Sequence, residues 1–302
     1  MSDEGPPQGL SRAAMQELDR VVEEALASGD ESGLRVLGYG EISLVLGWPA
    51  EEPRFACKRL PPFPDRSRFE TYGRTLSDYI GALRGAGVDV VETEFLPVER
   101  DGGTVVGYAV QPVLAPETLG PAVLARADPA RGHPLVEEIV KRATAVVGPR
   151  LGIDAQLSNW TWEDGGQLRY LDVTTPMLWS EDGTPRLDLG LLVQPLPAIL
   201  RPPVKRFLGP KILDGYRDLR GVMSDLCGNL LKERLGAWVP IFLIAANRTL
   251  DPPMTEAEVR RYYRSDARLW DALLRVRKLD RAWHRRVRHR PYPFLLPGEV
   301  ER

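Results

Sequence analysis

Cysteine and histidine are scarce in this sequence, which excludes two kinds of protein. Cys57 and Cys227 are the only cysteines, and the three histidines do not stand near them with the spacing of a zinc site. Two cysteines make no disulfide framework, although a single bond between them stays open. We therefore expect a cytoplasmic protein with no structural zinc.

Long apolar runs and an excess of one charge are also missing. The longest apolar run covers residues 237–246 and contains Pro240, about half of the roughly 20 residues that a bilayer crossing needs. Residues 1–12 lack the apolar core of a signal peptide. The formal net charge of −2 produces no overall field that would attract nucleic acid. A hydrophobic content of 43% over 302 residues instead predicts a globular protein large enough for two lobes.

Glycine and proline turns divide the first part of the chain into predicted elements. We expect residues 1–30 to hold a leader and a helix that begins after Ser11, since apolar residues follow at helical spacing. Residues 31–112 should form a lobe of five antiparallel strands with one helix at about 66–84. Residues 113–302 should form a second, mainly helical lobe. The predicted fold class is therefore α+β.

A short glycine loop and a strand lysine are the first candidate site residues. Gly38, Tyr39 and Gly40 separate two strand-like segments, and Ser43 follows them. Two such glycines let a hairpin backbone approach a ligand closely, although a plain glycine hairpin is the simpler interpretation. Lys58 shares a strand face with Ala56, where it could clamp a phosphate or be an ordinary solvated lysine. The predicted helix offers Glu70 and Asp78 as acidic partners for this lysine, with no basis for choosing between them.

Residues 152–176 contain the strongest candidate site. Asp154 and Asn159 precede a predicted hairpin, residues 160–171, whose second strand ends at Asp172. Mg²⁺ is a hard cation that takes oxygen ligands, so a carboxylate and an amide oxygen suit it. Asp172 would be the main metal ligand and Asn159 the second. Asp154 would orient an attacking hydroxyl or act as its base.

Taken in order, these motifs resemble the protein-kinase-like superfamily, in particular its small-molecule branch of aminoglycoside and choline-type phosphotransferases and a divergent bacterial group of kinase-like proteins. The resemblance covers roughly residues 30–180. It implies a two-lobed fold with ATP and Mg²⁺ as cofactors, a small-molecule hydroxyl as acceptor, and an interlobe hinge. The residues that match the superfamily are Gly38, Tyr39 and Gly40, Lys58, the hinge residues Gln111 and Val113, Asp154, Asn159 and Asp172.

Two departures from the superfamily pattern keep other functions open. Gly152-Ile153 stands where the superfamily usually has a histidine, and Val173-Thr174 follows Asp172 without a glycine. The alternative is an inactive pseudokinase scaffold that binds a partner through the basic region at 275–290. Adenylyl transfer by the same fold is a third hypothesis.

Two further segments have a simple interpretation and a functional one. The basic region at 275–290 predicts a solvated helix face rather than an anionic-lipid or nucleic-acid surface. Leu191–Leu200, with Arg201, Lys205 and Arg206 after it, predicts a buried, proline-broken segment rather than one that touches a membrane.

Overall fold

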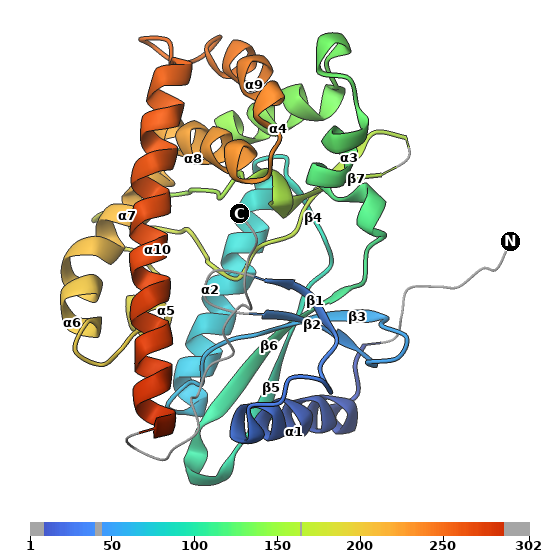
Figure 1. The fold of residues 1–302 in the computed structure, drawn as a ribbon, viewed down its shortest axis with the longest axis vertical. Helices are drawn as coiled ribbons and strands as arrows, with labels where there is room; N and C mark the ends of the chain where they lie inside the picture. The colour runs from blue at the N-terminus through green and yellow to red at the C-terminus, as the bar shows by residue number, and fades with distance from the viewer. Residues whose placement is uncertain (1–8, 40–43, 164, 287–302) are drawn as a thin grey trace, which may run out of the picture.

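The computed structural model describes residues 9–39, 44–163 and 165–286, which form an α+β fold with two lobes. A five-stranded antiparallel sheet builds the first lobe, and the second lobe is mainly helical (Figure 1). This confirms the predicted fold class. None of the helices in these ranges combines the length and the apolar character that a membrane crossing needs.

The sheet of the first lobe has the strand order β1-β2-β3-β6-β5, and every neighbouring pair is antiparallel. Its register places Val45, Lys58 and Ala109 side by side in the middle of the sheet. The strands are β1 (Val36–Tyr39), β2 (Leu44–Trp48), β3 (Phe55–Arg59), β5 (Glu94–Glu99) and β6 (Val105–Pro112).

One helix covers each face of this sheet. Helix α1 (Arg12–Ser28) begins after Ser11, whose hydroxyl caps it by accepting a hydrogen bond from the Ala14 amide. The apolar side of α1 packs on the sheet face that carries Leu46 and Cys57, so the helix that we expected beside a leader belongs to the core of the first lobe. Helix α2 (Arg66–Gly85) packs into a second core cluster, which contains Val105, whereas the α1 cluster contains Val106. Consecutive strand residues point to opposite faces of a sheet, so α2 covers the face opposite to α1.

Residues 89–99 are divided between two sheets. Strand β4 (Asp89–Val90) pairs in parallel with β8 (Gln167–Tyr170), which pairs antiparallel with β7 (Trp160–Glu163). Only β5, after Thr93, joins the five-stranded sheet. The predicted hairpin at 160–171 is confirmed, and its second strand also pairs with a segment of the first lobe.

The second lobe has its core around α4, α8 and α9, where Ile139, Leu226 and Phe242 are fully buried. Cys227 lies in this core and Cys57 in the other, and both are free thiols. The helices are α3 (Gly120–Arg126), α4 (Pro134–Val146), α5 (Leu189–Val193), α6 (Arg201–Pro203), a π-helical turn (Val204–Leu208), α7 (Gly209–Gly215), α8 (Leu219–Lys232), α9 (Val239–Ala246) and α10 (Glu256–Arg286). Short 3₁₀ turns lie at Asp101–Gly103, Pro116–Thr118, Pro129–Arg131, Leu157–Asn159 and Gly236–Trp238.

A buried aspartate joins α1 to the sheet. Asp19 is 5% exposed and accepts hydrogen bonds from the Tyr108 hydroxyl and from Nη2 of Arg100, each at 2.7 Å. Nε of Arg59 lies 3.5 Å from Oδ1 of the same carboxylate. Removing this carboxylate would leave the buried Tyr108 hydroxyl without its acceptor, and would leave Arg59 and Arg100 with Glu23 as their remaining acidic partner.

We therefore predict that Asp19→Ala lowers the free energy of unfolding by about 3 kcal/mol, because it breaks a buried ion pair and leaves a buried hydroxyl without its acceptor. Urea unfolding followed by circular dichroism measures this change. The control is Glu17→Ala on the same helix, since Glu17 forms an exposed ion pair with Arg20 that should contribute less than about 1 kcal/mol. Equal losses in the two variants would contradict the structural role of Asp19.

Candidate functional site

An ion pair between the two lobes forms the centre of the candidate site. Nζ of Lys58, on β3, lies 2.9 Å from both carboxylate oxygens of Asp172, two residues after the end of β8. The two side chains are 18% and 30% exposed. The structure therefore brings together two residues that the sequence places 114 positions apart.

Asp172 is held in its ionised form by its neighbours. Oδ1 also accepts hydrogen bonds from the amide and the hydroxyl of Thr174, at 3.1 and 2.8 Å. Burial by itself would raise the pKa of Asp172, but Lys58 and Thr174 outweigh burial and hold this pKa below its usual value of 3.8. Thr174, which stands where the superfamily pattern has a glycine, thus stabilises the carboxylate directly.

Neither acidic residue expected on α2 faces Lys58, so that prediction is wrong. Glu70 pairs with Arg66 at 2.9 Å, and Asp78 pairs with Arg186 at 2.5 Å. The inward side of α2 instead carries aromatic residues, because the apolar positions of this helix are those that pack against the core. Asp172 is the acidic partner of Lys58.

Two tyrosines of α2 hold the segments on both sides of the candidate site. The Tyr72 hydroxyl donates to the Thr174 carbonyl at 2.7 Å, and the Tyr79 hydroxyl donates to the Gly152 carbonyl at 3.1 Å. Burial raises the pKa of both phenols, and the charge of Asp172 raises each of them further. Both hydroxyls therefore remain protonated donors at every physiological pH.

The loop from Asp154 to Asn159 is bonded to the end of the hairpin. The Asp154 carbonyl accepts hydrogen bonds from Nδ2 of Asn159 and from the Tyr170 hydroxyl, each at 3.1 Å, and the Leu171 amide donates to the Asn159 carbonyl at 2.8 Å. After burial, the charges of Asp154 and Asp172 both raise the pKa of Tyr79. The charges of both carboxylates thus act on the same phenol.

The polar groups of the residues that we predicted as a hinge, Gln111 and Val113, have partners within the protein. Nε2 of Gln111 donates to the Thr93 hydroxyl at 2.9 Å and to the Leu171 carbonyl at 2.8 Å. The Val113 amide donates to the Arg54 carbonyl at 3.0 Å. Gln111 therefore connects the end of β6 to the residue that precedes Asp172.

The glycine loop is only partly described. Gly38 and the backbone of Tyr39 lie in β1, with Gly38 opposite Val45. Gly40 and Ser43 lie outside the described residues. A Cβ added at Gly38 would meet no atom within 4 Å, so close packing is not what requires glycine at this position.

Sequence reasoning missed a polar group that supports the Asp154 loop from the second lobe. Nε2 of Gln156 donates to Oδ2 of Asp225 on α8 at 2.9 Å, and the Tyr262 hydroxyl of α10 donates to Oδ1 at 2.8 Å. Burial raises the pKa of Asp225 despite these two hydrogen bonds. The available signal was an aspartate between the apolar residues Met223 and Leu226, because a buried acid there needs partners.

Glu233 follows α8 and lies against the same loop. Burial raises the pKa of Glu233 to about 7, against the opposing effects of Lys232 and a hydrogen bond with Ser158. Its Oε2 atom is buried and has no hydrogen-bond partner among the described residues. The loop between Asp154 and Asn159 therefore packs against a carboxyl group whose pKa is about 7.

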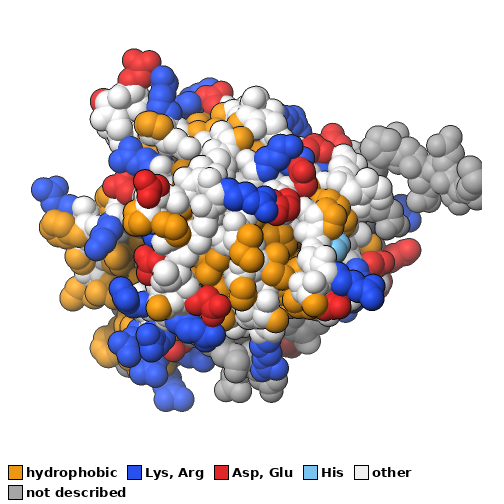
Figure 2. All heavy atoms as spheres, turned by 90° about the horizontal axis from the view of Figure 1, so that it is seen from above, with side chains coloured by type: hydrophobic (Ala, Val, Ile, Leu, Met, Phe, Trp, Pro, Cys, Tyr) orange, Lys and Arg blue, Asp and Glu red, His pale blue; other side chains and the backbone are white. Residues whose placement is uncertain are grey.

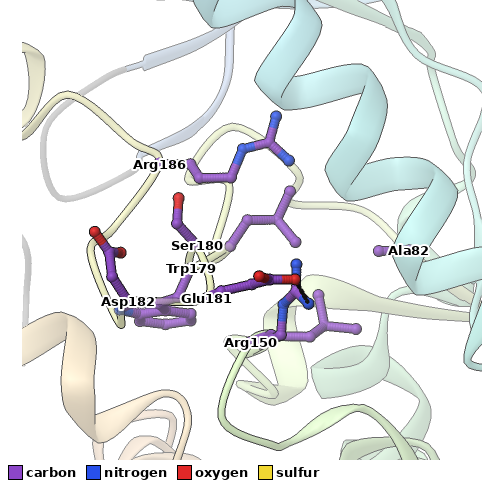
Figure 3. Close-up of a pocket in the computed structure, with 9 residues that line it drawn as sticks. Ala82, Arg150, Trp179, Ser180, Glu181, Asp182 and Arg186 are labelled. Carbon is purple, nitrogen blue, oxygen red and sulfur yellow. Dashed lines mark hydrogen bonds and ion pairs between the residues drawn. The ribbon is translucent and has the colours of Figure 1, made fainter.

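An open pocket of about 720 Å³ lies away from the Lys58–Asp172 pair. Figure 3 shows Arg150 next to Glu181, with Arg186 and Trp179 on the same wall and Ala82 of α2 across from them. Lys58, Asp154, Asn159 and Asp172 are not among its lining residues. Arg150 pairs with Glu181, Arg186 pairs with Asp78, and the Asp182 carboxylate accepts a hydrogen bond from the Thr184 amide.

Mg²⁺ is the metal that these residues would fit best. Among the described residues, no three histidine, cysteine or acidic side chains gather as a metal cluster. Mg²⁺ usually takes only one or two carboxylates and completes its shell with water and substrate phosphates. Asp172 supplies such a carboxylate, and Asn159 retains Oδ1 because its Nδ2 donates within the loop.

The fold and this centre define a two-lobed α+β protein with a lysine–aspartate pair between the sheet and the end of a hairpin. The chain belongs to DUF6206, a family of unknown function, which matches residues 17–281. A search of the curated proteins finds no match to the chain.

We predict that Lys58→Ala lowers the free energy of unfolding by about 2 kcal/mol, because Asp172 then stays half-buried without its cation. The double variant Lys58→Ala/Asp172→Asn should recover about half of that loss, since the unpaired charge is gone. Chemical unfolding of the single and double variants measures the coupling. Additive losses would show that the pair contributes no interaction of its own.

We also predict that stability depends on pH through Glu233. A carboxyl group whose pKa is higher in the folded protein than in the unfolded chain favours folding at low pH, and this contribution is lost as the pH rises through about 7. Glu233→Gln should therefore raise the free energy of unfolding at pH 8 by about 1–3 kcal/mol, with a much smaller effect at pH 5. Unfolding curves at the two pH values test this, and a pH-independent effect would contradict it.

Proposed function

We propose that the protein is an ATP- and Mg²⁺-dependent phosphotransferase that acts on the hydroxyl group of a small molecule. The observation that carries the proposal is the Lys58–Asp172 pair, with Nζ 2.9 Å from both carboxylate oxygens. Phosphoryl transfer needs a cation for the phosphates, an oxygen ligand for the metal and a carboxylate near the attacking hydroxyl. The site contains these groups within a bonded framework of loop, hairpin and sheet.

Each residue has a role that follows from its chemistry and its position. Lys58 would neutralise the phosphates of the nucleotide, and Asp172 with Asn159 would hold Mg²⁺. The bound metal would balance charge on the phosphates and orient the transferred group. Asp154 would orient the acceptor hydroxyl, because the tyrosine and amide contacts of its loop fix the backbone that carries it.

The observed ion pair is compatible with nucleotide binding because both charges would exchange one partner for another. Lys58 would turn from the Asp172 carboxylate to a phosphate, and Asp172 would turn from the ammonium group to the metal. Neither half-buried charge would be left unpaired, which would otherwise cost several kcal/mol. The Thr174 hydrogen bonds remain available to hold Asp172 during this exchange.

A small acceptor fits the segment after Asp172 better than a peptide does. Residues 177–187 fold back on the second lobe through bridges between Leu151 and Leu178 and between Trp179 and Pro185, and Trp179 is buried. A peptide-docking platform requires an exposed segment in this part of the chain. Such a platform would have to displace residues that are packed into the core.

A second candidate function is a catalytically inactive scaffold that binds a partner. The Lys58–Asp172 ion pair favours this function. Helix α2 supplies no acidic residue that would bind Lys58 in place of Asp172 and leave the Asp172 carboxylate to bind a metal. The basic region that would bind the partner runs from 275 to 290, and residues 287–290 lie outside the described part of the chain.

The test is thermal unfolding with and without millimolar Mg-ATP. A ligand at about 100 times its Kd stabilises the folded state by roughly 2.7 kcal/mol, so we expect a clear rise in Tm for the wild type. Asp172→Asn and Lys58→Ala should each abolish most of this rise, because each removes one of the charges that would hold Mg-ATP. Asp182→Asn, in an exposed turn away from the pair, should retain it.

Two results would remove the proposal. No rise in the wild type, with EDTA making no difference, would leave the scaffold as the better account. A rise that persists in Asp172→Asn would place nucleotide binding elsewhere on the protein.

A further inference from the structure

Residues 198–211 form a helical projection on the second lobe that exposes large apolar side chains to solvent. Every second residue from Leu191 to Pro197 is buried, as predicted for this segment. Ile199, however, is 83% exposed, so the prediction of a buried segment is wrong at this residue. Phe207, in the π-helical turn, is 69% exposed. Burying apolar surface is the main gain of folding, so two large hydrophobic residues this exposed on one short segment need another partner.

The charge of this projection, residues 198–211, has a single sign. It contains Arg201, Lys205, Arg206 and Lys211 and no acidic residue. The guanidinium group of Arg206 lies over the Phe207 ring at 5.8 Å. Lys205 reaches Asp188, which precedes α5, at 3.3 Å, and Nε of Arg201 donates to the Leu196 carbonyl. The exposed tip therefore presents Ile199 and Phe207 among cations.

The last turns of α10 repeat this combination. Leu279 is 70% exposed and Trp283 is 55% exposed. Arg275 and Arg286 are exposed at spacings of three, four, seven or eight residues from these two, and therefore lie on the same face of the helix. Helix α8 packs against both α7 and α10, so the elements that carry the two surfaces share a neighbour.

The figures agree with this arrangement. Figure 1 draws α6, α7 and the lower half of α10 on the left-hand side of the molecule. In Figure 2, hydrophobic and basic side chains lie next to one another along that left edge. Acidic side chains are interspersed on the rest of the visible face (Figure 2).

We propose that the projection and the end of α10 bind the surface of a membrane that contains anionic lipids. The partner is identified by charge complementarity, since basic residues lie on the same short segments as the four exposed hydrophobic residues. Basic residues near an anionic leaflet are attracted to it, while large apolar side chains and tryptophan enter the boundary between headgroups and acyl chains. A second protein chain of matching shape would bury the apolar residues without requiring cations around both surfaces.

The proposal concerns attachment to a surface and not a membrane crossing. It also does not depend on the Lys58–Asp172 centre, because none of the residues involved touches that pair. A protein that fails to bind Mg-ATP can still bind vesicles, and the reverse also holds. The two proposals are therefore tested separately.

The test is flotation of the full chain with vesicles of phosphatidylcholine alone and of phosphatidylcholine mixed with phosphatidylglycerol. We expect binding to the mixed vesicles only, and weaker binding at high salt because the charges are screened. Phe207→Ser should weaken binding about tenfold or more, as expected for one apolar side chain withdrawn from the boundary. Arg206→Glu should weaken it by a similar factor, because it replaces an attracted charge with a repelled one.

The matched controls alter similar residues on other surfaces. Ile244→Ser removes an isoleucine that is 64% exposed on α9, and Arg131→Glu makes the same change in net charge on an exposed turn before α4. Both controls should bind the mixed vesicles as the wild type does, and circular dichroism should show all four variants folded.

Three results would overturn the proposal. The first is equal binding of the wild type to both kinds of vesicle, and the second is an equal loss in the control variants. The third is a stable dimer in light scattering that Phe207→Ser dissociates, with no vesicle binding by the wild type. That result would assign the surface to a second copy of the chain.

Discussion

The interlobe ion pair between Lys58 and Asp172 is the interaction on which the candidate site depends. Lys58 comes from the middle of a five-stranded sheet, and Asp172 follows a hairpin that belongs to another sheet. A half-buried charge requires a partner, so the pair constrains how the two lobes sit at this point. The tyrosines of α2, Gln111 and Thr174 then hold the backbone on both sides of Asp172. These polar contacts support the geometry of the pair.

The support extends into the second lobe through the loop that carries Asp154. Gln156 connects this loop to Asp225 of α8, and Tyr262 connects Asp225 to α10. Gly152 is required for a packing reason, because a Cβ there would lie 2.4 Å from the Tyr216 carbonyl oxygen. The Asp154 loop is therefore held by contacts from the second lobe and by close backbone packing.

The pattern of local residues was sufficient to predict much of the fold. The Ser11 cap, the apolar spacing of α2 and the hairpin before Asp172 were all predicted because they depend on neighbours in sequence. The acidic partner of Lys58 was not predicted, because the pairing joins residues 114 positions apart and no local signal favours Asp172 over Glu70. Gln156 and Asp225 were missed because their contact joins residues 69 positions apart, although the apolar neighbours of Asp225 indicated that it is buried. The exposure of Ile199 was also missed, because an apolar run looks the same whether it packs inward or projects outward.

The central claim is that the Lys58–Asp172 pair is a metal–nucleotide site. Mn²⁺ shares the oxygen ligands that suit Mg²⁺ and can be followed by electron paramagnetic resonance. A titration of the protein with Mn²⁺, with and without ATP, tests the claim most directly. The account predicts that wild-type protein broadens the Mn²⁺–ATP signal and that Asp172→Asn does not. A wild-type spectrum identical to that of Mn²⁺–ATP in buffer would contradict it.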